Sequence, residues 1–335
     1  MKTAILFVVM LLVLIIPHEW GHMTVARWCG VKILEFSVGM GPLIFKKKKG
    51  DTQYSVRLLP LGGYCMMEGE EEAVDSETSY SSKSYPQKIA ILLAGVTMNV
   101  IIAFVAVTIA LCVSGVVTNS LGSVLPDSPA AAAGLREGDT IVMINGEKTD
   151  TWEAVSDGIG SYNGSGSIEI TYKRGSETET VSVVPEYNDE YKSYMIGISA
   201  GVTRNGWECV RRAPSAMWEL STAMIEGFKM LFTGQAGMDE VAGPVGLVRV
   251  VDQASDYGFA SYLTLLALVS LNLALFNLLP IPGLDGGKIF FIILKIISGG
   301  RINDDMEYKA TVAGMVLLLA LFVLITMNDV KNLFG

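Results

Sequence analysis

The sequence predicts a mainly α membrane protein with four transmembrane helices, a membrane-associated β loop and one external α+β domain. Half of the 335 residues are hydrophobic and only 18% are charged, and the mean hydropathy is +0.43. Four segments are apolar for long enough to cross a bilayer, which takes about 20 residues. Between the second and the third segment, a long polar stretch has the pattern of short strands and turns.

Charge and cysteine content exclude two classes of protein. The net charge is -9 and the isoelectric point is about 4.9, whereas nucleic-acid-binding proteins present basic faces, so we expect no nucleic acid partner. The cysteines form no CxxC pair and are scattered at Cys29, Cys65, Cys112 and Cys209. We therefore expect neither a disulfide framework nor a cysteine-ligated metal.

The first apolar segment, Thr3 to Trp28, lies in the predicted first region, residues 1–28. Lys2 followed by an apolar run resembles the start of a signal peptide, but no small-x-small cleavage motif follows. We therefore expect a retained transmembrane helix. The segment spans the bilayer only if it includes "HEWGH", residues 18–22. Placing ionisable side chains in a bilayer costs free energy. We therefore expect "HEWGH" to have a function that compensates for this cost.

The HExxH pattern predicts a zinc site. On a helix, His18 and His22 lie one turn apart on one face, where both imidazoles can bind one zinc ion beside Glu19 as general base. Five residues alone are a weak signal, but the chain contains only 2 histidines, and both are here. The alternative, a helix end with polar side chains that reach the interface, accounts for one histidine but not for two at ligand spacing.

Residues 29–88 are predicted to form a cytoplasmic, membrane-associated β loop and a linker. The strands "KILEFSV", "PLIFKKKK" and "TQYSVRLLPL" alternate apolar and polar residues and are separated at Gly39, at Gly41-Pro42 and at Gly50-Asp51. Gly62-Gly63 is expected to end the run. The loop is either a simple cap or, with Gln53 to Leu59 as its open strand, a clamp for extended substrate.

A second apolar segment, Ile89 to Val117, precedes the polar stretch, and 89–117 is the predicted second transmembrane helix. In residues 118–205 we expect a hairpin at Asn145-Gly146, a helix near Trp152 to Ser161, and two strands joined at Arg174-Gly175. This order, with "SPAAAAGLREGD" and "INGE", resembles a single PDZ domain over about residues 120–203. The resemblance implies a peptide groove near Leu121 to Leu125 and the helix after Thr151.

Linker helices are expected in residues 206–257, and the third and fourth transmembrane helices in residues 258–335, as Tyr262 to Pro280 and Ala310 to Met327. Catalytic zinc usually has three protein ligands, so an Asp, Glu or Cys must complete the site. Asp285 in "NLLPIPGLDGG" is the only acidic residue between Asp256 and Asp304. The alternative role for Asp285 is to N-cap a helix that begins near Lys288.

Basic residues predict the orientation in the membrane, because short cytoplasmic loops are rich in Lys and Arg. Both such loops should be cytoplasmic, which puts both termini and residues 118–257 outside. The residues that carry this prediction are Arg27, Lys32, Lys46 to Lys49, Arg57, Lys83 and Lys88 after the first segment, and Lys288, Lys295, Arg301 and Lys309 after the third.

Together, "HEWGH" and "NLLPIPGLDGG", separated by a PDZ-like insertion, resemble the site-2 protease family of intramembrane zinc metalloproteases, in particular its bacterial PDZ-containing RseP/RasP type. "PLGGY" (60–64), "GPVGL" (243–247) and "LAGVTMN" (93–99) support the resemblance. The family usually has proline where Val96 stands. Long members carry two PDZ domains in tandem, whereas this chain has room for one.

The resemblance implies that His18, His22 and Asp285 hold Zn²⁺, that Glu19 activates water, and that Asn277 helps to hold substrate or the oxyanion. The implied function is intramembrane cleavage of single-span proteins in the bacterial plasma membrane, with the active site toward the cytoplasm and the PDZ-like domain outside. Implied substrates are anti-sigma factors pre-cleaved by a site-1 protease and remnant signal peptides. Alternatives from other classes are a catalytically silent PDZ-bearing scaffold and a metal transporter.

Overall fold

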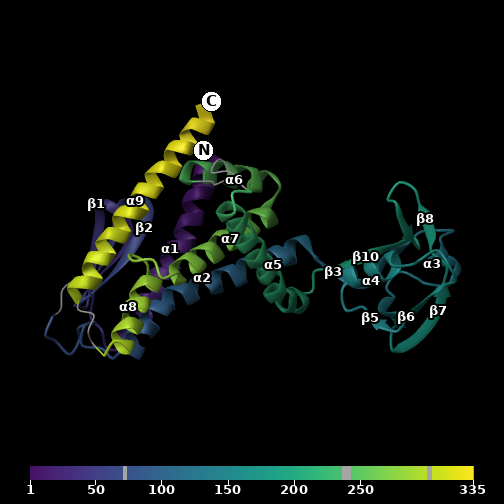
Figure 1. The fold of residues 1–335 in the computed structure, drawn as a ribbon, viewed down its shortest axis with the longest axis horizontal. Helices are drawn as coiled ribbons and strands as arrows, with labels where there is room; N and C mark the ends of the chain where they lie inside the picture. Colours follow the sequence, from purple (N-terminus) through teal and green to yellow (C-terminus); the bar gives the residue numbers. More distant parts are fainter. Residues whose placement is uncertain (71–73, 236–242, 300–303, 335) are drawn as a thin grey trace. The chain divides into compact units, whose positions relative to one another are not determined.

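The computed structural model describes residues 1–70, 74–235, 243–299 and 304–334 (Figure 1). The chain divides into two compact units. One unit, Met1–Ala110 with Ala213–Gly335, contains the long apolar helices and is called the helical unit below. The other, Leu111–Arg212, is called the inserted domain.

Four helices in the described part of the chain are long and apolar enough to cross a membrane, as predicted. They are α1 (Lys2–Trp28), α2 (Tyr85–Ser114), α7 (Phe259–Leu278) and, within α9 (Asp304–Phe334), the span Asp305–Asp329. The end of the second predicted segment differs. Gly115 has a φ of +89° and ends α2, so the valines that follow belong to a strand rather than to the helix.

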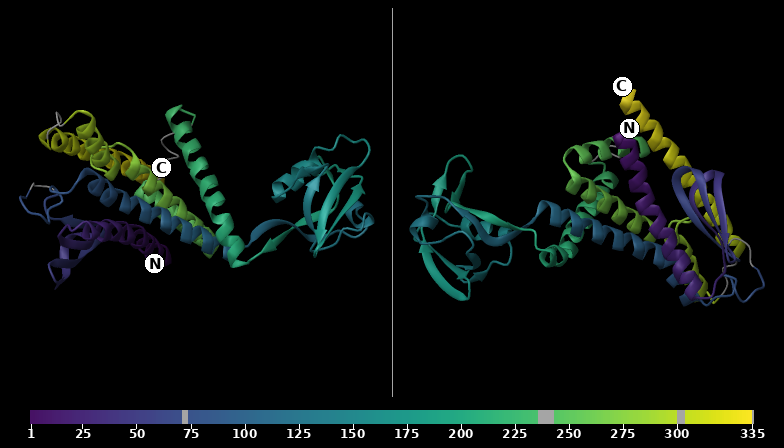
Figure 2. Two further views of the ribbon diagram at one scale, coloured as in Figure 1. Left: turned by 90° about the horizontal axis from the view of Figure 1, so that it is seen from below. Right: turned by 180° about the vertical axis from the view of Figure 1, so that it is seen from behind.

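Small residues let the apolar helices of the helical unit approach closely. A Cβ atom at Gly21 of α1 would stand 2.6 Å from the Ala94 carbonyl oxygen of α2. The Tyr262 hydroxyl of α7 donates to the Leu6 carbonyl of α1 (2.9 Å). In both views of Figure 2, α1, α2 and α7 lie next to one another. Such close backbone approach is typical of helix packing in membranes.

Residues 33–67 form two long antiparallel strands, β1 (Ile33–Lys49) and β2 (Thr52–Met67), rather than three short ones. The predicted break at Gly39 and Gly41 is instead a change of register, and both glycines have positive φ, +86° and +80°. Glycine accommodates the irregular backbone of a bulge without ending the strand. The expected end at Gly62-Gly63 is also wrong, because β2 continues to Met67.

The repeated register shifts give β2 one inner and one outer part. Tyr54 lies opposite both Phe36 and Lys47, and Ser55 lies opposite both Ser37 and Lys46. Residues 53–56 are thus enclosed on both sides, so the prediction that Gln53 to Leu59 is the open strand is wrong for residues 53–56. Residues 63–67 pair only with the first part of β1 among the described residues.

Three further helices connect or support the apolar ones: α5 (Gly206–Phe232), α6 (Pro244–Asp256) and α8 (Asp285–Ile297). The "GPVGL" motif is the start of α6, and a side chain of α9 caps it. Asp329 accepts hydrogen bonds from the backbone N–H groups of Gly243, Val245 and Gly246 at 2.8–3.0 Å. A carboxylate there satisfies orphan N–H groups and complements the helix dipole.

The inserted domain contains a sheet whose strands follow the order β10-β3-β4-β6-β7, with β5 beside β4. The turn at Asn145 (φ +50°) and Gly146 (φ +81°) joins β4 to β5 as expected, and α4 lies where the sequence predicts a helix. The elements are β3 (Val116–Val124), α3 (Pro129–Ala132), β4 (Thr140–Ile144), β5 (Glu147–Lys148), α4 (Trp152–Gly160), β6 (Ile168–Arg174), β7 (Glu177–Val183), β8 (Glu186–Asn188), β9 (Ser193–Met195) and β10 (Ile198–Thr203).

The predicted peptide groove at residues 121–125 is contradicted at its first residue, Leu121. β3 is an inner strand: Leu121 lies opposite Ala200 of β10 on one side, and on the other its N–H donates to the Asp139 carbonyl. A backbone that is bonded on both sides has no free groups for an added strand. The strands at the two edges of this sheet are β10 and β7.

Candidate metal centre

The two histidines of "HEWGH" lie on one face of α1. Their Nε2 atoms are 3.1 Å apart, and their rings meet edge to face. His22 is buried and His18 is half-buried. The four-residue spacing, a little more than one helical turn, produces this arrangement directly.

Asp285 reaches the same place from the start of α8. The loop "LPIPGL" folds tightly against the start of α8: a Cβ atom at Gly286 would stand 2.4 Å from the Leu279 carbonyl oxygen, and one at Gly287 would stand 2.2 Å from that of Ile281. Asp285 is itself the first residue of α8, and Leu284 occupies the cap position. The alternative that Asp285 caps a helix beginning near Lys288 is therefore wrong.

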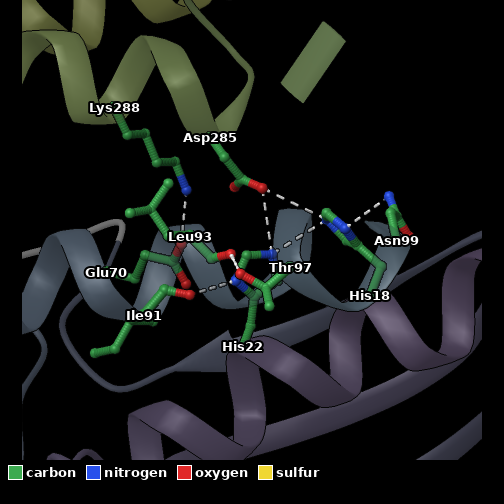
Figure 3. Close-up of polar contacts among 9 residues, drawn as sticks. All are labelled: His18, His22, Glu70, Ile91, Leu93, Thr97, Asn99, Asp285 and Lys288. Atoms are coloured by element: carbon green, nitrogen blue, oxygen red, sulfur yellow. Dashed lines mark hydrogen bonds and ion pairs between the residues drawn. The ribbon is translucent and has the colours of Figure 1, made fainter. Parts of the chain in front are cut away.

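Together the three side chains form a compact triangle (Figure 3). Asp285 Oδ2 lies 3.5 Å from His18 Nε2 and 3.3 Å from His22 Nε2. Zinc–ligand bonds of about 2.0–2.1 Å in a tetrahedral site separate the ligand atoms by about 3.3–3.4 Å. Asp285 Oδ2 is also buried without a hydrogen-bond partner in the described chain, which is unfavourable unless a cation is present. Two imidazoles and a carboxylate with this spacing fit zinc.

Glu19 lies on α1 beside the triangle and next to the outer part of β2. The Cβ atom of a side chain at Gly63 would stand 3.5 Å from Glu19 Cγ. The Glu19 carboxyl group also lies near the Cys65 backbone and interacts electrostatically with His22 and Asp285. The carboxylate is therefore adjacent both to the proposed ligands and to the unpaired edge of β2.

Residues of α2 contact both histidine rings, which the sequence did not indicate. His22 Nδ1 donates to the Ile91 carbonyl oxygen (2.8 Å), and His18 Nδ1 lies 3.3 Å from the Asn99 side-chain amide. A Cβ atom at Gly95 would stand 2.3 Å from His22 Nε2, so the rings occupy the space that any other residue would fill. Gly95 and Asn99 belong to "LAGVTMN", whose departure at Val96 leaves α2 uninterrupted.

An ion pair fixes α8 to the segment that follows β2. Lys288 Nζ lies 2.6 Å from Glu70 Oε1, one helical turn after Asp285. The pair connects the helix that carries the third proposed ligand to the end of the β loop (Figure 3). The sequence analysis used Lys288 only for the orientation in the membrane and did not pair it with Glu70, since charged residues are common in loops and at helix starts.

The structure does not bring Asn277 into this triangle. It lies in the last turn of α7, half-buried, and within the described chain it makes no hydrogen bond to the three proposed ligands.

Two solved structures resemble part of this chain. The PDZ domain of an SdrC-like protein from Listeria monocytogenes is 30% identical, with 24% of this chain and 84% of that chain covered and a TM-score of 0.23. The corresponding PDZ domain from Listeria innocua is 30% identical, with 25% and 92% covered and a TM-score of 0.23.

Relatives are similar along nearly the whole chain. A Clostridium acetobutylicum protein provisionally named a zinc metalloprotease is 35% identical, with 95% of this chain and 94% of the relative covered. The zinc metalloprotease RasP of Shouchella clausii is 29% identical over all of both chains. The regulator of sigma-W protease RasP of Bacillus subtilis is 29% identical, with 99% of each covered.

One protein-family model, that of peptidase family M50, matches residues 6–321. The match includes all three residues of the metal-site triangle, the whole of the second and third apolar spans, and most of the first and fourth. The chain belongs to peptidase family M50, the family of site-2 proteases.

Proposed function

We propose that this metalloendopeptidase cleaves the transmembrane segments of single-span membrane proteins, with His18, His22 and Asp285 as zinc ligands and Glu19 as general base. The family supports the reaction class, and the four apolar helices support a membrane location. The observation that carries the site assignment is the triangle of ligand atoms, with sides of 3.1–3.5 Å, inside the helical unit.

Bound zinc would supply a Lewis acid that polarises the scissile carbonyl and makes a water molecule acidic enough to lose a proton near neutral pH. Glu19 takes up that proton at its carboxylate and returns it to the nitrogen of the leaving amine. Asn277 donates an uncharged N–H group to the substrate carbonyl oxygen as negative charge develops there.

The outer part of β2 is the proposed holder of substrate. A helical substrate has its carbonyl groups bonded and covered, so it must unwind before a carbonyl can be attacked. Residues 63–67 have β1 on one side only and lie next to Glu19 at Gly63. Strand addition to this edge would hold an extended segment beside the general base.

We further propose that the substrates include anti-sigma factors already shortened by a site-1 protease, and remnant signal peptides. The name of the Bacillus subtilis relative, a regulator of sigma-W protease, supports the first class. The basic loops on either side of the site support an active site toward the cytoplasm of a bacterial plasma membrane, with the inserted domain outside. The lipid bilayer would then surround the apolar helices.

Co-expression with a tagged single-span substrate tests this proposal. Wild type should release a shortened product, whereas Glu19→Gln should release none, because the amide cannot accept the proton. Glu226→Gln, an exposed change of the same type on α5, is the matched control and should cleave normally. Product formation by Glu19→Gln at the wild-type rate would refute the assignment of the general base.

A further inference from the structure

A fully buried amide lies beside the first proposed zinc ligand. Asn99 of α2 is 0% exposed. Its Nδ2 atom is 3.3 Å from His18 Nδ1, and its Oδ1 atom is buried without a hydrogen-bond partner among the described residues. Its backbone is held in place, because the Ser270 hydroxyl of α7 donates to the Asn99 carbonyl oxygen (2.7 Å).

Two nitrogen atoms that face each other cannot both be donors. Nδ2 of an amide always carries hydrogen, so this contact is favourable only if His18 Nδ1 carries none. The imidazole proton would then be on Nε2. Nε2 is the atom that points toward Asp285 and His22, and it must be unprotonated to bind a metal. The contact as it stands is therefore incompatible with zinc ligation by His18.

Rotation of the amide by half a turn removes this conflict. The two ends of a carboxamide have nearly the same shape. After rotation, Oδ1 faces His18 Nδ1 and accepts its hydrogen, and the orphaned oxygen gains a partner. The His18 ring is then the tautomer whose Nε2 lone pair is directed at the metal.

We propose that Asn99 is a positioning residue for zinc: its side-chain oxygen accepts the Nδ1–H of His18 and so fixes the tautomer and the ring orientation that ligation requires. The proposal rests on the assignment of His18 as a zinc ligand. Metal-binding histidines generally donate their second ring nitrogen to such an acceptor.

The second ring nitrogen of His22 also has an acceptor, in this case a backbone carbonyl. Its Nδ1 atom donates to the Ile91 carbonyl oxygen of α2. The acceptors for both rings thus come from one helix, two turns apart, with Gly95 between them leaving space for the rings. The acceptor of Asn99 belongs to a side chain, so mutation can change it, whereas that of Ile91 is a backbone carbonyl.

The test measures the zinc affinity of the purified full-length protein by competition with a chelator. Asn99→Leu keeps the volume but removes the acceptor, and should weaken zinc binding about 10- to 100-fold. Asn99→Asp keeps an acceptor oxygen and should restore affinity to within a few-fold of wild type. Thr97→Val is the control on α2, because Thr97 is exposed and its hydroxyl bonds only within the helix.

Two outcomes would overturn the proposal. If Asn99→Leu binds zinc as tightly as wild type, the Gly95 carbonyl, the other acceptor near the His18 ring, is sufficient. If Asn99→Asp loses as much affinity as Asn99→Leu, the residue acts by packing or as a donor. Should Asn99→Leu fail to fold, Asn99→Ala takes its place with the same expected loss and the same Asp comparison.

His18→Ala separates this inference from the proposed function. Loss of zinc in His18→Ala together with wild-type affinity in Asn99→Leu would refute only the role of Asn99. Full zinc retention by His18→Ala would refute the ligand assignment itself.

Discussion

At the scale of single residues, a glycine decides whether the two histidines can meet. Gly95 lies in the middle of α2, where glycine is the poorest helix former apart from proline. Its Cα faces both imidazole rings, and an added Cβ would stand 2.3 Å from His22 Nε2 and 2.7 Å from His18 Cε1. The two imidazole rings therefore occupy the space that a side chain at position 95 would fill.

Gly95→Ala should remove zinc without unfolding the helix. The methyl group must displace at least one ring, so we expect zinc affinity to fall at least about 10-fold, as for other changes that misorient a ligand. Alanine favours helix by about 1 kcal/mol over glycine, so helix content should not fall. Metal analysis and circular dichroism check both parts. Gly227→Ala in α5, where a Cβ meets nothing within 4 Å, is the control and should retain zinc.

Some residues of this site can be identified from the sequence and others cannot, and the difference has a physical reason. His18, Glu19 and His22 stand out because their spacing is short and local, and Asp285 because it is the only acid in an apolar region. Asn99 carries no such signal. α2 is apolar all round, so the sequence does not indicate which face of it meets α1, and the role of a buried amide depends on that face.

At the scale of elements, the orientation of β2 decides where substrate can bind. Alternation of apolar and polar residues correctly predicted extended structure in residues 33–59, but it could not predict which strand stays open. Glycine accounts for the failure: Gly39 and Gly41 are compatible with a turn and with a bulge, and only tertiary pairing decides between them. The open edge is the part of β2 after Gly62, which the sequence analysis had placed outside the sheet.

Cys65→Pro should lower cleavage while zinc content stays unchanged. Cys65 lies in the outer part of β2, which has β1 on one side only, and proline removes its backbone N–H donor. Cys65→Ala keeps the N–H group and should cleave normally, which separates loss of the donor from loss of the thiol. Initial rates on a tagged substrate and metal analysis are the measurements. Normal cleavage by Cys65→Pro would show that β2 is only a cap.

At the scale of the whole molecule, each unit has a core of its own. The core of the inserted domain is formed by twelve buried side chains, Leu121 and Ile141 among them. The sequence predicted its strand order along the chain because hairpin turns such as Asn145-Gly146 are local. The pairing of β3 with β10 joins residues about 80 positions apart, and nothing local in the sequence encodes it.

One buried ion pair makes the inserted domain sensitive to acid. Arg174 donates to both carboxylate oxygens of Asp139 at 2.8 and 2.7 Å. Burial by itself raises the pKa of Asp139, but hydrogen bonds from Arg174 and from the Arg136 backbone outweigh burial and hold that pKa below its ordinary value. This stabilisation is complete above the pKa of the unfolded chain, about 3.9, and is lost as the pH falls through the lower folded value.

Arg174→Gln should therefore destabilise the inserted domain at neutral pH and leave zinc in the helical unit. Its midpoint of thermal unfolding should lie below that of wild type at pH 7. The difference should shrink as the pH falls below about 4, where Asp139 of the unfolded chain takes up a proton, and toward the lower folded pKa. Thermal scans across that pH range and metal analysis are the measurements. A difference between variant and wild type that does not depend on pH would contradict this account, as would loss of zinc.

The central claim gives two neighbouring carboxylates different functions, and metal analysis of two variants tests it most directly. Glu19→Gln should retain about one zinc ion per chain and cleave nothing, because only the base is lost. Asp285→Ala, like His18→Ala and His22→Ala, should lose both zinc and cleavage, because three ligands become two. If Asp285→Ala instead retained a full complement of zinc and normal cleavage, the triangle of His18, His22 and Asp285 would not be the metal site.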